Sequence, residues 1–207
     1  MRDTQSGQIF VITAPSGTGK TTLTRDLRNT VDGLGVCISH TTRTPREGEV
    51  NGESYHFVDQ TTFDAMVSNG EFLEYAPNYG NAYGTSLAAA QVVLDQGLDL
   101  VLEIDWQGAQ QIKALRPDAI WILIVPPSME TLRQRLESRQ TETAATLKTR
   151  IEAAQTEIDE AKAADYLIVN DDLDTAKQAL RSVVTANRLR FARMIGTKPS
   201  IAALFSA

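Results

Sequence analysis

The chain has 207 residues and a net charge of −6, from 20 lysines and arginines against 26 aspartates and glutamates. This length suits one domain with a sizeable core. The acidic balance argues against nucleic acid or an anionic membrane as a partner. The longest apolar run, around Ile120–Val125, is too short to span a bilayer, and the first residues, MRDTQSGQ, contain no apolar signal core. The single cysteine, Cys37, excludes an intramolecular disulfide, so we expect a cytoplasmic protein in which Cys37 is a small buried hydrophobe.

A phosphate-binding loop is the strongest local signal. The β-branched run Ile9–Ile12 does not alternate with polar residues, which is typical of a strand covered on both faces of a parallel sheet. Ala14–Thr21 then follows the pattern G-x-x-x-x-G-K-[ST], except that alanine replaces the first glycine. Lys20 can reach terminal phosphates and the Thr21 hydroxyl can ligate magnesium. The alternative, a chance turn before a helix, does not explain the strand that precedes the loop.

The rest of the chain alternates helices and strands, which indicates a parallel sheet covered by helices. We expect strands over Val36–Ser39, Tyr55–Val58, Phe72–Tyr75, Leu98–Ile104, Ile120–Val125 and Tyr166–Val169. We expect helices over Thr61–Asn69, Ser86–Gln96, Gly108–Leu115, Met129–Ser138, Ala144–Ala163 and Asp174–Arg193, and turn chemistry over Pro77–Thr85. The stretch Ser39–Thr85 is polar and aromatic, so we interpret it as a small lobe inserted into the core.

Two arginines, Arg43 and Arg46, flank Pro45 in a polar loop of this lobe. Two guanidinium forks on a stiff turn can hold a phosphate dianion. The alternative is a solvated loop in which Arg43 pairs with Glu47.

Carboxylates and arginines form two further candidate clusters. Glu103 and Asp105 follow a buried strand at its carboxyl end, where ligands bind in such sheets, although Asp105 can also cap the next helix. Arg135 and Arg139 lie one helical turn apart, where their like charges repel each other. A polyanion bound against both side chains would turn this repulsion into a favourable interaction. The alternative for these arginines is a solvated helix face.

The motifs APSGTGK, SHTTRTPREGEVNGESYHF, GEFLEYA, YGT, LEIDWQGA and IVNDDL, in this order between about Gln8 and Arg181, resemble the guanylate kinase family. The resemblance implies an α/β P-loop NTPase fold with a mainly parallel core sheet, an inserted monophosphate-binding lobe and a helical lid. It also implies Mg²⁺-dependent transfer of the γ-phosphoryl group of ATP to GMP or dGMP. The core would cover about 8–38, 86–130 and 151–187, the lobe 39–85, the lid 131–150 and a C-terminal extension 188–207.

The resemblance also implies roles for individual residues. The ATP-binding residues would be Ala14, Pro15, Ser16, Gly17, Thr18, Gly19, Lys20, Thr21, Thr22 and Asn170, with Thr21 on the metal. The GMP-binding residues would be Ser39, Arg43, Arg46, Tyr55, Glu74, Tyr83, Thr85, Glu103 and Asp105. The catalytic residues would be Lys20, Arg43, Arg135, Arg139 and Arg150. The sequence departs from the family at Gln140, where glycine is frequent, so the lid hinge is expected to be stiffer.

The chemistry of guanine agrees with one of these roles. Guanine offers N1–H and N2–H₂ donors beside an O6 acceptor, so the Glu74 carboxylate matches its donor edge. Without the resemblance, Glu74 reads as an exposed strand charge and Asn170 as part of a turn and helix cap.

Two other functions fit part of the sequence. A non-catalytic guanylate-kinase-like module would bind partner proteins through 39–85, but it has no use for Lys20. A kinase for another phosphorylated small molecule, such as a ribose bisphosphate, would leave Glu74 idle. We interpret Arg188, Arg190 and Arg193 of the extension as a solvated face, and expect a chain cut after Asn187 to stay active.

Overall fold

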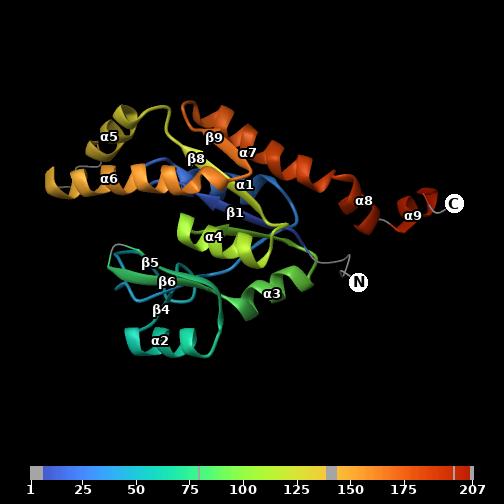
Figure 1. The fold of residues 1–207 in the computed structure, drawn as a ribbon, viewed down its shortest axis with the longest axis horizontal. Coiled ribbons are helices and arrows are strands. Elements are labelled where there is room, and N and C mark those ends of the chain that lie inside the picture. The colour runs from blue at the N-terminus through green and yellow to red at the C-terminus, as the bar shows by residue number, and fades with distance from the viewer. Residues whose placement is uncertain (1–6, 79, 139–143, 198, 206–207) are drawn as a thin grey trace.

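The computed structural model describes residues 7–78, 80–138, 144–197 and 199–205. Its larger sheet is parallel and runs β2 (Leu34–Val36), β7 (Asp99–Glu103), β1 (Ile9–Thr13), β8 (Ile120–Val125) and β9 (Tyr166–Val169) (Figure 1). All five residues of β1 are buried. The expected α/β fold with a mainly parallel core sheet is therefore confirmed.

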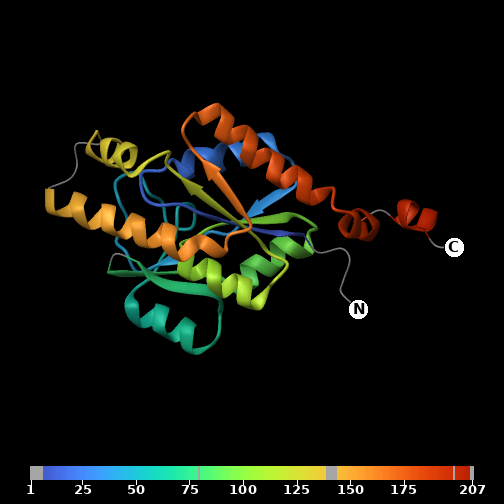
Figure 2. The ribbon, with the colours of Figure 1, turned by 45° about the horizontal axis from the view of Figure 1, so that its top comes forward.

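Helices cover both faces of this sheet, as the unbroken apolar strands require. Phe10 and Ile12 pack with α1 (Lys20–Thr30) and α7 (Leu173–Arg188) on one face. Ile9 and Val11 pack with α3 (Leu87–Asp95) and α4 (Trp106–Leu115) on the other. Figure 2 shows the two pairs of helices on opposite sides of the strands. Within the described ranges, no helix is both long and apolar enough to cross a bilayer.

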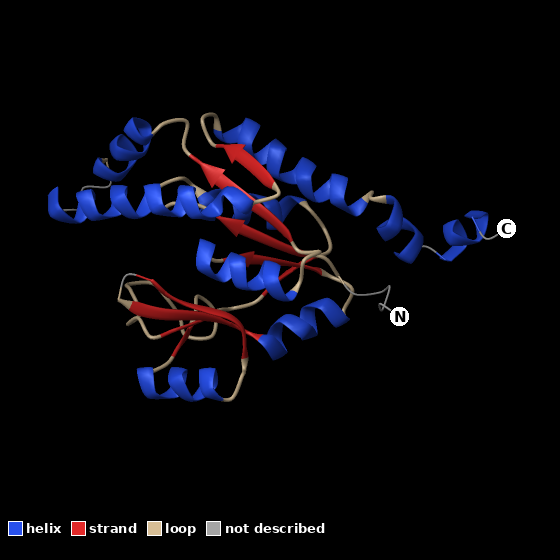
Figure 3. Cartoon of the chain, in the orientation of Figure 1, coloured by secondary structure: helices blue, strands red, loops and turns tan. Residues whose placement is uncertain are grey.

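A second, smaller sheet stands apart from the first and carries α2 (Gln60–Ser68) (Figure 3). Its strands run β4 (His56–Phe57), β3 (His40–Thr41), β6 (Asn81–Ser86) and β5 (Phe72–Asn78). The prediction of turn chemistry over Pro77–Thr85 was wrong for most of that stretch, because β5 and β6 form a long antiparallel hairpin. The turn residues serve only its tip, where Asn78 lies opposite Asn81 and Gly80 has a φ of 77°.

The chain leaves the larger sheet three residues earlier than expected. A strand over Val36–Ser39 was predicted, but β2 ends at Val36 and β3 begins at His40. Ser39 therefore lies in the connection between the two sheets. The helix predicted over Ser86–Gln96 corresponds to α3, whose N-cap is Ser86: its side chain accepts a hydrogen bond from the Ala89 N–H.

Two helices, α5 (Met129–Glu137) and α6 (Ala144–Glu160), pack against each other and lead through the short η1 (Ala161–Ala163) to β9. Leu132 and Leu136 of α5 are fully buried in this contact, together with Ala154 of α6. The predicted helices Met129–Ser138 and Ala144–Ala163 thus correspond closely to the structure.

The prediction of one final helix over Asp174–Arg193 was wrong, because α7 ends at Arg188 and α8 begins at Phe191. The helices α8 (Phe191–Thr197) and α9 (Pro199–Ala202) and the turn η2 (Ala203–Phe205) follow. The prediction of a solvated arginine face was also wrong for two of its three members. Arg188 Nε donates to Asp99 Oδ2 at 2.8 Å, and Arg193 Nη2 donates to Asp99 Oδ1.

The helix break explains how both guanidinium groups reach one carboxylate, since residues five apart on a continuous helix point to different faces. Asp99 is 1% exposed, and it also accepts the N–H of Gln8 at 2.8 Å. Only Arg190 remains on the surface as expected. The start of the extension is therefore tied to Asp99, the first residue of the interior strand β7.

We expect the double variant Arg188→Ala/Arg193→Ala to lose about 3 kcal/mol of unfolding free energy, because a buried carboxylate without its cations is strongly destabilising. Urea unfolding measures this loss. The matched variant Arg190→Ala removes an exposed charge from the same segment and should stay within about 0.5 kcal/mol of the wild type. Equal unfolding curves for the double variant and the wild type would contradict the role of Asp99.

Candidate active site

The phosphate-binding loop lies where β1 ends and α1 begins. Gly17 and Gly19 have φ values of 91° and 98°, a left-handed conformation that other residues rarely adopt. A helix amino terminus carries free N–H groups and a positive dipole end, so this loop is suited to bind an anion. The sequence prediction of the loop and its helix is confirmed by this geometry.

Neighbouring segments pack tightly against the back of the loop. A Cβ on Gly17 would come within 2.8 Å of Leu136 Cδ2 of α5, and one on Gly19 within 2.6 Å of Asn170 Nδ2. The Asn170 amide donates to the Thr18 carbonyl at 2.6 Å, and Arg135 Nη2 donates to the Asn170 carbonyl at 3.0 Å. Asn170 is 5% exposed, so it braces the loop from behind.

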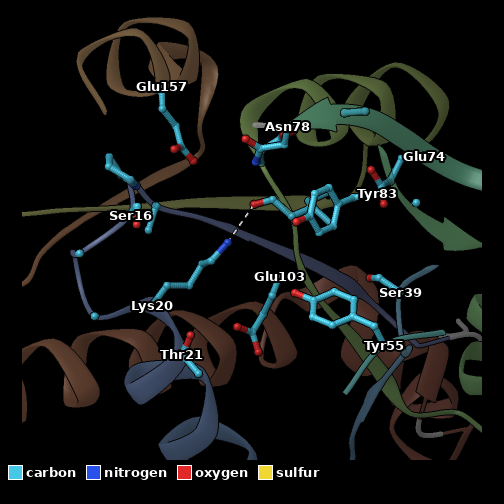
Figure 4. Close-up of a pocket in the computed structure, with 18 of the residues that line it drawn as sticks. Ser16, Lys20, Thr21, Ser39, Tyr55, Glu74, Asn78, Tyr83, Glu103 and Glu157 are labelled. Carbon is cyan, nitrogen blue, oxygen red and sulfur yellow. Dashed lines mark hydrogen bonds between the residues drawn. The ribbon is translucent and has the colours of Figure 1, made fainter. Parts of the chain in front are cut away.

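A cavity of about 350 Å³ lies in front of the loop and extends to the smaller sheet. Lys20 reaches across it, and its Nζ donates to the Ile104 carbonyl at 3.2 Å (Figure 4). The cavity is lined by Ala14, Pro15, Ser16, Gly17, Gly19, Lys20, Thr21 and Thr22 from the loop and α1, by Glu103, Ile104 and Asp105 at the end of β7, by Ser39, Tyr55, Glu74, Ala76, Asn78, Tyr83 and Gly84 from the smaller sheet and its connections, and by Glu157 of α6. The structure thus brings most of the predicted phosphate-loop and lobe residues into one cavity.

Glu74 lies on β5 and its carboxyl group is almost completely buried, with 4% of the residue exposed. The Thr85 hydroxyl of β6 donates to Glu74 Oε1 at 2.6 Å. Gly108, in the first turn of α4, leaves room for the other oxygen, since a Cβ there would lie 2.3 Å from Oε2. Burial, together with the nearby Asp105 carboxylate, raises the Glu74 pKa to about 7, while the Thr85 hydrogen bond opposes the shift. Thr85 itself is buried behind Glu74 and does not line the cavity.

The alternative interpretation of Glu74 as an exposed strand charge is therefore wrong. Asp105 caps α4 by accepting the Gly108 N–H at 3.1 Å, and it also lines the cavity. The predicted helix cap is therefore confirmed, and the ligand-binding role of Asp105 stays a prediction that its place in the cavity allows.

The arginine loop lies beside the cavity, next to the aromatic residues of the smaller sheet. The Arg43 guanidinium carbon is 5.5 Å from the ring centroid of Tyr55, and the Tyr55 and Tyr83 rings are 6.0 Å apart. Burial raises the pKa of the Tyr55 phenol above its ordinary value. Neither Arg43 nor Arg46 is among the residues that line the cavity. Arg43 pairs with Glu49 at 2.8 Å, whereas the solvated-loop alternative had paired it with Glu47.

The predicted lid arginines that the structure describes are Arg135 and Arg150. Arg135 on α5 and Arg150 on α6 are partly buried but do not line the cavity. Arg139 and Gln140 lie outside the described residues.

Sequence reasoning did not identify five of the lining residues: Ala76, Asn78, Gly84, Ile104 and Glu157. Glu157 is the most consequential of them, because its carboxyl group points into the cavity near the phosphate loop (Figure 4). Burial raises its pKa to about 7, partly offset by the charge of Lys20. The sequence did contain a signal for Glu157. It lies three residues after buried Ala154 and four before buried Ala161, so it shares their inward face of the helix.

The chain is similar to proteins of known family over most of its length. A family model described as guanylate kinase matches residues 6–187. The guanylate kinase of Alkalilimnicola ehrlichii is 46% identical over 187 residues, 90% of this chain and 92% of that protein. The guanylate kinase of Chromohalobacter salexigens is 45% identical over 201 residues, 97% of this chain and 94% of that protein. The crystal structure of guanylate kinase from Anaplasma phagocytophilum superimposes with a TM-score of 0.73 at 32% identity, over 91% of this chain and 90% of that one.

Proposed function

Because the chain belongs to the guanylate kinase family, it is a nucleoside monophosphate kinase that transfers the γ-phosphoryl group of ATP to GMP, and we propose that the cavity between the two sheets is its active site. In this proposal the phosphate loop binds ATP, and segment 39–85, with the smaller sheet, binds GMP. The single cysteine, Cys37, fits a reducing compartment such as the cytoplasm.

The observation that carries the proposal is a buried carboxylate and a phosphate loop facing one cavity. Glu74 is almost fully buried, and the Thr85 hydroxyl donates to only one of its two carboxylate oxygens, Oε1. A carboxylate with oxygen lone pairs left over accepts the N1–H and N2–H₂ donors of guanine. Adenine has no N1–H, so an adenine in this place would leave the carboxylate buried without a partner.

Charge neutralisation and positioning account for the chemistry. The acceptor is itself a phosphate that is largely ionised near neutral pH, so the reaction needs no strong general base. Lys20 would stabilise charge on the transferring group, while Arg43 would align the acceptor phosphate. Arg135 and Arg150 remain predicted as the arginines that close over the phosphates.

The residues at the end of β7 and the start of α1 fit a magnesium ion. Mg²⁺ prefers oxygen ligands and keeps several waters in nucleotide sites. Thr21 would supply its hydroxyl, and Glu103, which lines the same cavity, has a carboxylate that can bind through water. When bound, the ion would neutralise phosphate charge.

A protein-binding module of the same fold explains less of this site. Such a module needs only the surface of segment 39–85. It gives no reason for Lys20, two left-handed glycines and Glu74 to share one cavity.

Proton release on GMP binding tests the role of Glu74. The pKa of about 7 means that the carboxyl group is about half protonated in the empty site at neutral pH. Guanine donors need the ionised form, so GMP binding at pH 7 should release about half a proton from Glu74. The affinity should fall about tenfold between pH 8 and pH 6, because the proton competes with GMP. Calorimetry in two buffers of different ionisation enthalpy measures both quantities.

The GMP phosphate also titrates in this range, so the control is the same titration with Glu74→Gln. The difference between the wild type and the variant isolates Glu74. Equal proton release by the two proteins would remove Glu74 from the base site.

A further inference from the structure

We propose that Glu49 is a positioning residue for the acceptor phosphate, because it holds the Arg43 guanidinium and the Arg46 backbone in one fixed arrangement. The inference rests on the proposed acceptor site in segment 39–85. It assigns to Glu49 no contact with substrate; Glu49 acts through Arg43.

Both carboxylate oxygens of Glu49 are used within the arginine loop. Oε1 accepts from Arg43 Nη2 at 2.8 Å, and Oε2 accepts the Arg46 N–H at 2.7 Å. The Glu49 N–H in turn donates to the Arg46 carbonyl at 3.0 Å. One side chain therefore joins the two ends of the loop that carries both arginines.

The Arg43 side chain is restricted on its other sides as well. Nη1 donates to the Thr44 carbonyl at 2.8 Å, and the guanidinium lies 5.5 Å and 5.8 Å from the ring centroids of Tyr55 and Phe57. The side chains of Arg43 and Glu49 are only 13% and 21% exposed. Water therefore screens this ion pair less than it screens an ordinary surface pair.

The arrangement leaves donors for a ligand. A guanidinium has five N–H groups, of which Glu49, the Thr44 carbonyl and the Tyr83 hydroxyl take three. A guanidinium that is already held in place loses less conformational freedom when a phosphate binds. Glu49 therefore increases the affinity for the phosphate without contacting the phosphate. The hydrogen bond with Arg43 also lowers the Glu49 pKa, so the Glu49 carboxylate stays ionised near neutral pH.

The variant Glu49→Gln tests the inference with little change in shape. Its amide has one acceptor oxygen, whereas Arg43 and Arg46 both present donors, so one of the two contacts must be lost. We expect the KM for GMP to rise about tenfold, the effect of losing one charged hydrogen bond, while the KM for ATP stays unchanged. Guanosine, which has no phosphate, should bind the variant and the wild type equally well in calorimetry.

Glu47→Gln is the matched control, because Glu47 is an exposed carboxylate of the same loop. It removes the same charge, and its KM for GMP should stay within about twofold of the wild type. In an Arg43→Lys background, Glu49→Gln should have a smaller effect than in the wild type, since one of the two groups that it positions has already been replaced. An equal effect of Glu49→Gln and Glu47→Gln, or an undiminished effect in the Arg43→Lys background, would overturn the inference.

Failure of the proposed function gives a different result. In that case the wild type releases no ADP with GMP. GMP binding to the wild type, Glu49→Gln and Glu47→Gln, measured by calorimetry, then still decides whether Glu49 positions a phosphate-binding arginine.

Discussion

Replacing Lys20 by alanine is expected to lower kcat by about 10³-fold while GMP binding stays nearly intact. Lys20 projects from the phosphate loop, and its Nζ lies 3.2 Å from the Ile104 carbonyl at the end of β7. The proposed base-binding residue, Glu74, lies on the smaller sheet. In the proposed site the lysine binds the donor phosphates, so its loss should not alter the acceptor side.

Steady-state kinetics and calorimetric titration with GMP measure the two effects. Lys162→Ala is the control, because the Lys162 side chain is 75% exposed and pairs only with a near neighbour, Asp159, in the described structure. The control should keep full activity. If GMP affinity falls together with kcat in Lys20→Ala, the division of the cavity into donor and acceptor sides is wrong.

Glu74→Gln should lower kcat/KM for GMP by about 10²-fold and leave the KM for ATP unchanged. The glutamine offers one acceptor oxygen where the carboxylate offers two, so a guanine donor is left unpaired. In the wild type, a site built on such hydrogen bonds should favour GMP over AMP by roughly 10⁴-fold or more. IMP keeps N1–H and O6 but lacks the amino group, so its kcat/KM should lie between those of GMP and AMP.

Loss of folding would not explain this result. The folded pKa of Glu74, about 7, is above its ordinary value of 4.5, so ionising the carboxyl group destabilises the empty protein as pH rises from 4.5 through 7. Glutamine does not ionise, and the variant should be more stable than the wild type at pH 8, by up to about 3 kcal/mol. Glu71→Gln, a change at an exposed position three residues earlier, is the kinetic control. A Gln variant with unimpaired GMP turnover would contradict the assignment of Glu74.

Local chemistry was sufficient to predict much of the fold and part of the site. The buried runs of β1 and β8, the phosphate loop and the cap residues Ser86 and Asp105 each depend on neighbours a few positions away. Such signals can be read from one sequence. The motif of the phosphate loop was therefore sufficient to predict that Lys20 belongs to the site, and Lys20 lines the cavity.

The remaining features depend on contacts between distant residues. The stretch Pro77–Thr85 is rich in turn residues, and only its pairing within the smaller sheet makes most of it strand. Asp99 and Arg188 are 89 positions apart, so composition alone could not show that the extension is tied to the core. Glu157 reaches the cavity because α6, which packs against α5, carries it beside residues of the phosphate loop that are more than 130 positions earlier in the chain.

We expect this chain to phosphorylate GMP in the cavity shared by Lys20 and Glu74. The most direct measurement is ADP release from ATP by the wild-type chain, in a coupled assay with each nucleoside monophosphate and with ribose phosphates as separate acceptors. We predict rapid release with GMP, weak release with IMP, and release near background with AMP, the pyrimidine nucleotides and ribose phosphates. Equal release with AMP and GMP, a ribose phosphate as the best acceptor, or no release with any monophosphate would contradict the account.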